Sequence, residues 1–155
     1  MKISDFLSPA DVALDVRADD KSCLLQKLST QATTELSLNA EEVSSAIMKR
    51  EELGSTGVGN GVALPHARLR EIEEPFGLFI RLRHAIDFEA IDDQPVDLVF
   101  LLLLPNAPHE PQLNALACVA RALRDPGTLQ RVRSALDREA LFRVITDASG
   151  KKSLD

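Results

Sequence analysis

A histidine that follows a proline is the residue of this sequence whose type and setting best suit chemistry. His66 comes directly after Pro65 in the stretch GNGVALPHARLRE, and Arg68 and Arg70 place two cations just behind it. A neutral imidazole is a competent nucleophile near pH 7, and its charge state is readily tuned. Phosphoryl transfer to it would need one ring nitrogen to attack while the other donates to a fixed acceptor, with further donors for the phosphoryl oxygens. The alternative that the residues leave open is a surface turn that happens to contain a histidine.

The segment before His66 is rich in glycine. Glycines stand at positions 54, 57, 59 and 61, and Ser55 and Thr56 lie between the first two. The spacing matches neither GxxxxGK[ST] nor GxGxxG, so a nucleotide-binding loop is disfavoured. Glycines let backbone amides turn inward as an anion-binding nest, and the two hydroxyls would add donors. A tight connection that needs positive φ angles explains the same glycines, and the spacing alone does not choose between the two.

Other kinds of catalytic or metal site find little support. His66, His84 and His109 have no spacing typical of metal ligands, so we expect no metal. Cys23 and Cys118 lack a CxxC partner, and we interpret both as reduced core thiols. The acidic stretch HAIDFEAIDDQP is interpreted as a solvated turn rather than a pair of catalytic carboxylates.

The composition is that of an ordinary globular domain. Hydrophobic residues make up 45% of the 155 residues and charged residues 27%. The net charge of −6 and the six Phe without Trp or Tyr disfavour nucleic-acid binding, which needs a positive surface and stacking platforms. The longest apolar run is too short to cross a membrane, and no signal-peptide pattern is present, so we expect no membrane insertion and a cytoplasmic location.

Helical and strand patterns alternate along the chain. Periodic apolar residues predict helices over 20–36, 40–53, 109–123, 128–136 and 138–145, with Asn39 and Asp137 as N-caps. Alternating or continuous apolar residues predict strands over 76–83 and 96–104, with a possible short strand over 62–64. Interleaved helices and strands indicate an α/β fold, a mixed sheet with helices on both sides. We expect one domain over residues 1–148 and a flexible tail over 149–155.

Five stretches of the chain, in order, carry a family resemblance: ISDFLSP, REELGSTGVGNGVALPHARL, FEAIDDQPVDLVFLLLLP, LNALACVARAL and LFRVITD. Together they resemble the IIA proteins of the bacterial phosphoenolpyruvate-dependent phosphotransferase system. The resemblance is to the fructose/mannitol type and is closest to its nitrogen-regulatory branch. The fold that it implies is the three-layer α/β fold of that group.

The resemblance implies a phosphoryl carrier whose histidine is His66, with a phosphohistidine intermediate and no cofactor. The donor would be a small histidine-containing phosphocarrier protein (HPr/NPr-like). The family's site arginine falls on Arg50, sixteen residues upstream of the histidine, and its hydroxyl pair on Ser55 and Thr56. Arg68 is a further candidate for phosphoryl binding. The targets implied for this branch are nitrogen-regulation or potassium-transport components.

One position departs from the family pattern. A second histidine usually precedes the leucine at the start of the helix after the apolar strand, and that position here is Gln112. Its amide could bind a phosphoryl group but cannot change charge at physiological pH. His109, three residues earlier, is the other candidate, although Pro111 lies between them.

The sequence therefore leaves three candidate functions open. The first is a regulatory phosphocarrier whose phosphorylation state controls target proteins. The second is a sugar-specific IIA component that passes phosphate to a fructose or mannitol permease. The third is an interaction module whose His66 is never phosphorylated. Fold similarity cannot choose among them, because function depends on the site and its partners.

Overall fold

The computed structural model describes residues 1–106 and 110–150, with the backbone alone at 110–113 and 149–150. Two short 3₁₀ helices, η1 (Ile3–Asp5) and η2 (Pro9–Asp11), precede the main elements. In chain order these are β1 (Val12–Val16), α1 (Lys21–Leu36), α2 (Ala40–Glu52), β2 (Gly57–Gly59), β3 (Val62–Ala63), β4 (His66–Leu69), β5 (Phe76–Ile86), β6 (Val96–Pro105), α3 (Glu110–Arg124), α4 (Pro126–Ser134) and α5 (Arg138–Gly150).

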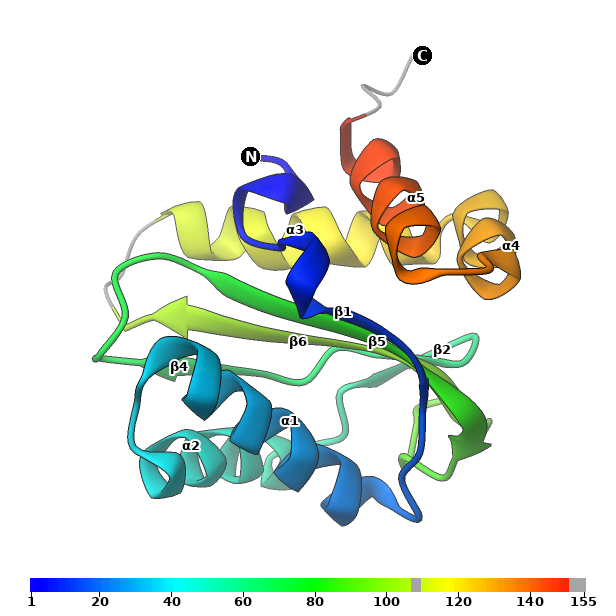
Figure 1. The fold of residues 1–155 in the computed structure, drawn as a ribbon. Coiled ribbons are helices and arrows are strands. Elements are labelled where there is room, and N and C mark those ends of the chain that lie inside the picture. The colour runs from blue at the N-terminus through cyan, green and yellow to red at the C-terminus, as the bar shows by residue number, and fades with distance from the viewer. Residues whose placement is uncertain (107–109, 151–155) are drawn as a thin grey trace.

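The elements form three layers, as Figure 1 shows, with the sheet between two groups of helices. Helices α1 and α2 cover one face, and α3, α4 and α5 cover the other. Within the described residues the sheet has six strands in the order β1-β5-β6-β3-β2, and β4 pairs with β6 beyond the end of β3. The predicted fold class, a mixed sheet with helices on both sides, is confirmed.

Strand β6 is the centre of the sheet. It pairs antiparallel with β5 and parallel with β3 and β4, and nearly all its side chains are buried. Its continuous apolar sequence is what a strand covered on both faces requires. Successive side chains point to opposite faces, so Leu98, Phe100 and Leu102 enter the core under α3–α5, and Val99, Leu101 and Leu103 the core under α1 and α2.

Local capping signals fix the helix boundaries beside the site. The Asp20 side chain accepts a hydrogen bond from the Cys23 amide at the start of α1, and Asn39 accepts one from the Glu42 amide at the start of α2. Such caps satisfy N–H groups that have no partner within the helix. Asp137 caps α5 in the same way, through the Ala140 amide. The predicted caps at Asn39 and Asp137 are confirmed.

The structure differs from the sequence predictions at several elements. Strand β1 was not predicted, and β5 continues to Ile86, beyond the predicted end at residue 83. Helix α4 begins at Pro126, two residues before the predicted start, because Asp125 accepts from the Thr128 amide as the N-cap and proline is well tolerated in the first turn. The backbone of α5 continues to Gly150, and the domain boundary at residue 148 stays a prediction.

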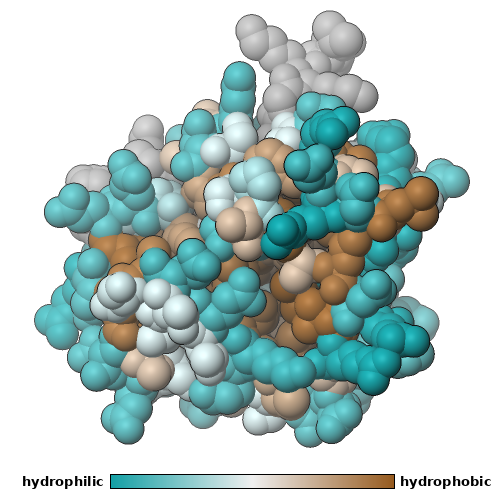
Figure 2. All heavy atoms as spheres, in the orientation of Figure 1, coloured by the Kyte–Doolittle hydropathy of each residue, from teal (hydrophilic) through white to brown (hydrophobic). Residues whose placement is uncertain are grey.

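The outer surface in the view of Figure 2 mixes hydrophilic and hydrophobic side chains. Apolar side chains gather across the middle of this face, at the level of the sheet in Figure 1, and hydrophilic ones dominate above and below. No helix of the described residues combines the length and the apolar character that crossing a membrane demands.

Candidate functional site

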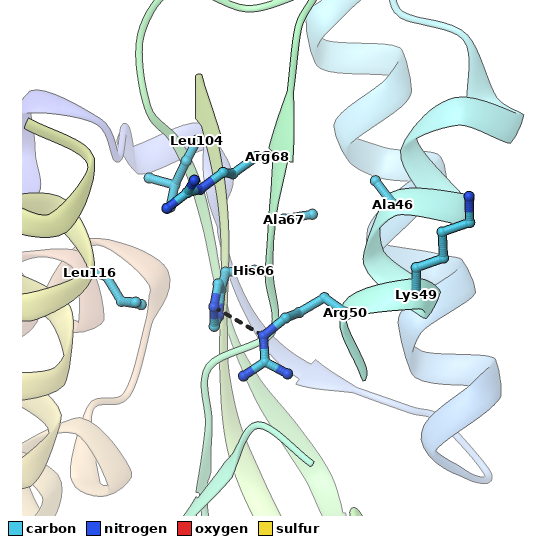
Figure 3. A pocket seen from close by; sticks show the side chains of 8 residues that line it. All are labelled: Ala46, Lys49, Arg50, His66, Ala67, Arg68, Leu104 and Leu116. Atoms are coloured by element: carbon cyan, nitrogen blue, oxygen red, sulfur yellow. Dashed lines mark hydrogen bonds between the residues drawn. The ribbon is translucent and has the colours of Figure 1, made fainter. Parts of the chain in front are cut away.

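A cavity of about 410 Å³ lies at β4, between α2 and α3. Eight residues line it, as Figure 3 shows: Ala46, Lys49, Arg50, His66, Ala67, Arg68, Leu104 and Leu116. Among the paired strands described, β4 has only β6 as a neighbour, so its other edge is not covered by a strand. The site therefore lies at an edge of the sheet, where the helical layers on the two faces meet.

His66 is held in one tautomer. Its Nδ1 lies 2.9 Å from the carbonyl oxygen of Leu64, and a carbonyl oxygen can only accept, so Nδ1 carries the proton. The Nε of Arg50 donates to Nε2 of His66 over 3.3 Å, which requires a lone pair on Nε2. Both contacts thus assign the same tautomer. Figure 3 shows the imidazole between α2 and α3, with Arg50 reaching it from α2.

The surroundings of His66 favour its neutral form. Burial is the largest cause and lowers the pKa of His66 below its usual value of 6.5, and the Arg50 and Arg68 guanidinium groups lower this pKa further. The Leu64 carbonyl and the Glu51 carboxylate raise it but do not cancel these effects. The neutral imidazole is the nucleophilic form, so at neutral pH His66 is ready to react.

The charged residues that line the cavity are cationic. Arg50 projects from the last turn of α2, Lys49 precedes it, and Arg68 lies two residues after His66 on β4. None of the eight lining residues carries a carboxylate. On a chain whose net charge is −6, this local positive charge suits an anionic group beside Nε2.

The hydroxyls of Ser55 and Thr56 are engaged elsewhere and do not line the cavity. Ser55 donates its hydroxyl to the Phe88 carbonyl oxygen over 2.7 Å. The Thr56 side chain is buried and donates to the Glu51 carboxylate. Contacts from either hydroxyl to a phosphoryl group stay a prediction, one that would require these hydrogen bonds to be exchanged.

The glycine-rich segment is a folded connection rather than an open nest. The amides of Gly54, Thr56, Gly57 and Asn60 donate to Glu51 O, the Glu51 carboxylate, Ser55 Oγ and Asp92 Oδ2, respectively. Gly59 and Gly61 have φ angles of 104° and 79°, where glycine is favoured. The expectation of inward-pointing amides is not met at these four positions, because the chain reversal itself uses them. His66 begins strand β4 and does not end a loop.

The two candidates for the family's second histidine position are only partly placed. His109 lies outside the described residues. Gln112 belongs to the first turn of α3, four residues before the cavity residue Leu116, but its side chain also lies outside the described part. The choice between them stays a prediction.

The sequence interpretation missed Ala46, Lys49, Leu104 and Leu116 as neighbours of His66. A partial signal was available, because Ala46 and Arg50 are four residues apart and share one face of a helix. Leu104 and Leu116 are brought in by the sheet register and by the packing of α3, which sequence periodicity does not reveal. Across the described stretches, no cluster of three or more His, Cys, Asp or Glu side chains could hold a metal ion.

A three-layer α/β fold with a nucleophilic histidine in a cationic cavity is consistent with a phosphocarrier, and comparison with known families supports this class of protein. The chain belongs to the family described as "Phosphoenolpyruvate-dependent sugar phosphotransferase system, EIIA 2", whose model matches residues 5–148. This is a family of phosphotransferase-type phosphocarriers.

Relatives within the family narrow the class. The chain is 41% identical to a nitrogen regulatory protein of Bradyrhizobium diazoefficiens, over 94% of this chain and 95% of that protein. The crystal structure of nitrogen regulatory protein IIA-Ntr from Neisseria meningitidis matches with a TM-score of 0.88 and 30% identity, over 93% of this chain and 99% of that one. Mannitol IIA of Escherichia coli has a TM-score of 0.75 at 18% identity, over 89% of this chain and 97% of that one, and so shares the fold. These matches support a regulatory function of the phosphotransferase-system type.

Proposed function

We propose that this protein is a cytoplasmic regulatory phosphocarrier in which Nε2 of His66 accepts a phosphoryl group from a histidine-phosphorylated carrier protein. Its phosphorylation state would then control its binding to target proteins. The observation that carries the proposal is the single tautomer of His66, which leaves the Nε2 lone pair beside Arg50 in a cationic cavity.

The transfer balances without an added base. The Nε2 lone pair attacks phosphorus, and the nitrogen–phosphorus bond of the donor breaks, returning its electron pair to the donor's ring nitrogen. No proton leaves Nε2, because the proton is on Nδ1. The positive charge that the ring of His66 gains is stabilised by the Leu64 carbonyl, and the donor ring loses an equal charge.

The cations of the cavity would hold the transferred group. A phosphoryl group on nitrogen carries close to two negative charges, and guanidinium groups match its oxygens in geometry and charge. Arg50 is the first candidate, because its Nε already contacts Nε2 and needs only a small movement to reach a phosphoryl oxygen. Arg68, from the same strand as His66, is the second.

The output would be a change in protein binding. A new dianion at the cavity offsets most of the positive charge of Lys49, Arg50 and Arg68, which strengthens some protein contacts and weakens others. We expect the target proteins among components of nitrogen regulation or potassium transport, as the family resemblance implies.

The test is phosphotransfer from phosphoenolpyruvate through the first enzyme of the system and its carrier protein, with the adduct mapped by mass spectrometry under alkaline conditions. We expect an acid-labile phosphoryl group on His66 that is absent from His66→Ala. His84→Ala is the matched control, because His84 is exposed on β5 and does not line the cavity. Failure to label from any cognate carrier would contradict the proposal and favour an unphosphorylated interaction module.

A second experiment separates regulation from sugar transport. The phosphorylated protein is mixed with the cytoplasmic domain of a fructose or mannitol permease. We expect the phosphoryl group to stay on His66. Rapid transfer to the permease domain would instead assign the protein to sugar uptake.

A further inference from the structure

Glu51 and Thr56 form a buried pair behind the site. The Glu51 carboxylate accepts hydrogen bonds from the Thr56 amide over 2.9 and 3.0 Å and from the Thr56 hydroxyl. Both residues are more than nine-tenths buried, and Lys21 Nζ lies 3.7 Å from the carboxylate. A buried carboxylate with this many donors is a rigid anchor, because breaking any one contact leaves charge in a medium that solvates it poorly.

One end of this anchor leads to Arg50. Thr56 lies two residues after Gly54, and the Gly54 carbonyl oxygen accepts a hydrogen bond from Arg50 Nη1 over 3.1 Å. Fixing Thr56 against Glu51 fixes the short segment that carries this carbonyl. The guanidinium is thus held at Nη1 by the loop while its Nε points at His66.

The other end leads to the imidazole. The Leu64 amide donates to the Thr56 carbonyl oxygen over 2.9 Å, and the Leu64 carbonyl in turn accepts from Nδ1 of His66. The position of Thr56 therefore sets the position of the group that selects the tautomer. The contacts that lead to the Arg50 guanidinium and those that lead to the Leu64 carbonyl therefore both begin at Thr56.

We infer that the Glu51–Thr56 pair is the positioning element of the site, holding the Leu64 carbonyl and the Arg50 guanidinium on His66 so that Nε2 is the nucleophile. This inference rests on the proposed phosphocarrier function for its kinetic consequence. It gives Thr56 a role through other residues rather than a direct contact with the phosphoryl group.

The main test is the Thr56→Val variant, which keeps the shape of the side chain and the amide but removes the hydroxyl. The first readout is the pair of ¹⁵N shifts of the His66 ring in the unphosphorylated protein, which report the tautomer directly. The second is the rate of phosphotransfer from the phosphorylated carrier. We expect a mixed tautomer and a rate about tenfold lower, the change that losing one hydrogen bond to a charged group produces.

The kinetics of Thr56→Val distinguish positioning from docking. We expect kcat to fall and the KM for the donor to stay nearly unchanged, because the buried side chain of Thr56 is out of reach of a docking protein. Thr56→Ser restores the hydroxyl and should recover both the single tautomer and most of the rate. A direct phosphoryl ligand would also be rescued by serine, but its loss would leave the tautomer of the free protein unchanged.

The chain offers a matched control at Thr128, which is also buried. Its amide and hydroxyl both donate to one carboxylate oxygen of Asp125, over 2.9 and 2.8 Å. Thr128→Val thus removes the same kind of bond at the start of α4, away from the cavity. It should lower the melting temperature and leave the tautomer and the transfer rate at wild-type values.

The outcomes are separable from those that test the proposed function. A Thr56→Val protein that folds and keeps both the single tautomer and the wild-type rate overturns the inference. If Thr56→Val does not fold, Glu51→Gln takes its place, with the same two readouts and the same expected direction. A wild-type protein that is never phosphorylated would refute the carrier function, whereas the tautomer measurement would still decide the positioning role.

Discussion

At the scale of single residues, the neutral state of His66 depends on burial more than on any one neighbour. Because the folded pKa is lowered below 6.5, the unfolded chain binds a proton more readily than the folded protein between these two values. The free energy of unfolding should therefore fall as the pH drops from about 6.5 through the folded pKa. Below the folded pKa the contribution of His66 should stay constant, because both states are then protonated.

This pH dependence gives the first prediction. The ¹⁵N-detected titration of His66 should have its midpoint below 6.5 in the folded protein, and phosphotransfer should decline only below that midpoint. His66→Gln should flatten the stability change between the two pKa values, as measured by urea unfolding at several pH values. A midpoint above 6.5 would show that the carboxylate and carbonyl outweigh burial, contrary to this account.

Arg50 gives the second prediction. Arg50→Lys keeps the charge but cannot contact both His66 Nε2 and the Gly54 carbonyl through one planar group. We expect the rate of phosphotransfer to fall about tenfold, with the thermal midpoint little changed. Lys49→Arg is the control, because Lys49 lines the same cavity, whereas the described hydrogen bond to Nε2 of the imidazole comes from Arg50. A wild-type rate in Arg50→Lys would contradict this account, because it would show that only the charge of Arg50 matters and not its planar geometry.

At the scale of elements, the last turn of α2 supplies one side chain to the cavity and another to the buried pair behind it. Arg50 and Glu51 are neighbours in the last turn, and successive helix positions are about 100° apart, so the arginine reaches the cavity and the carboxylate turns into the interior. The Asn39 cap fixes the start of α2, and the hydrogen bond from the Gly54 amide to the Glu51 carbonyl oxygen lies at its end.

The glycine connection gives the third prediction. A Cβ at Gly57 would lie 2.7 Å from Ala90 Cβ and 2.8 Å from Ala90 Cα, so the β5–β6 connection packs directly on this backbone. Gly57→Ala should reduce the free energy of unfolding by about 1–3 kcal/mol, as overpacking does, and should slow phosphotransfer because the shifted loop carries the Gly54 carbonyl.

Gly127→Ala is the comparison for this loop. A Cβ there would meet the flexible end of Arg131 at 3.2 Å and Oδ2 of the Asp125 side chain at 3.4 Å, with no backbone atom in the way, and the residue lies in the first turn of α4. We expect a stability within about 1 kcal/mol of wild type, on the stabilising side. Equal effects of the two substitutions in urea unfolding would contradict the close approach at Gly57.

The sequence predicts these elements unevenly, for physical reasons. Helices α1 and α2 follow from periodic apolar residues and local caps, which act within a few residues. Strand β1 escapes notice because five residues with one buried and one exposed position carry little pattern, and only its pairing with β5 defines it. The start of β4 at His66 likewise depends on register with Leu102 of β6.

The site shows the same division. His66 and Arg50 could be named from the sequence, because their motif is local and its family pattern is specific. The direction of the Thr56 hydroxyl could not, since a hydroxyl can serve a phosphoryl group or a carboxylate, and the choice depends on how Glu51 is turned at the end of α2.

At the scale of the whole molecule, the site lies where three layers meet at one edge of the sheet (Figure 1). A group transferred to Nε2 is near α2, β4 and α3, whereas β1 lies at the opposite edge, beyond β6 and β5. Changes that follow phosphorylation should therefore be local.

Hydrogen exchange tests this locality, which is the fourth prediction. We expect altered protection in the C-terminal turn of α2, in β4 and in α3, and unchanged protection in β1 and α1. His66→Ala treated with the same donor is the control. Changes centred on β1 would mean that the phosphorylated state differs globally and that targets read a conformational change rather than a local charge.

The most direct measurement of the central claim is the position of the phosphoryl group on the His66 ring. The protein, labelled with ¹⁵N in its histidines, is phosphorylated through its carrier protein, and nitrogen–phosphorus coupling together with the ring proton signals assigns the bonded nitrogen. The hydrogen bonds from Nδ1 to Leu64 and from Arg50 to Nε2 predict phosphorus on Nε2 and a retained proton on Nδ1. Phosphorus on Nδ1, or on a residue other than His66, would contradict the account.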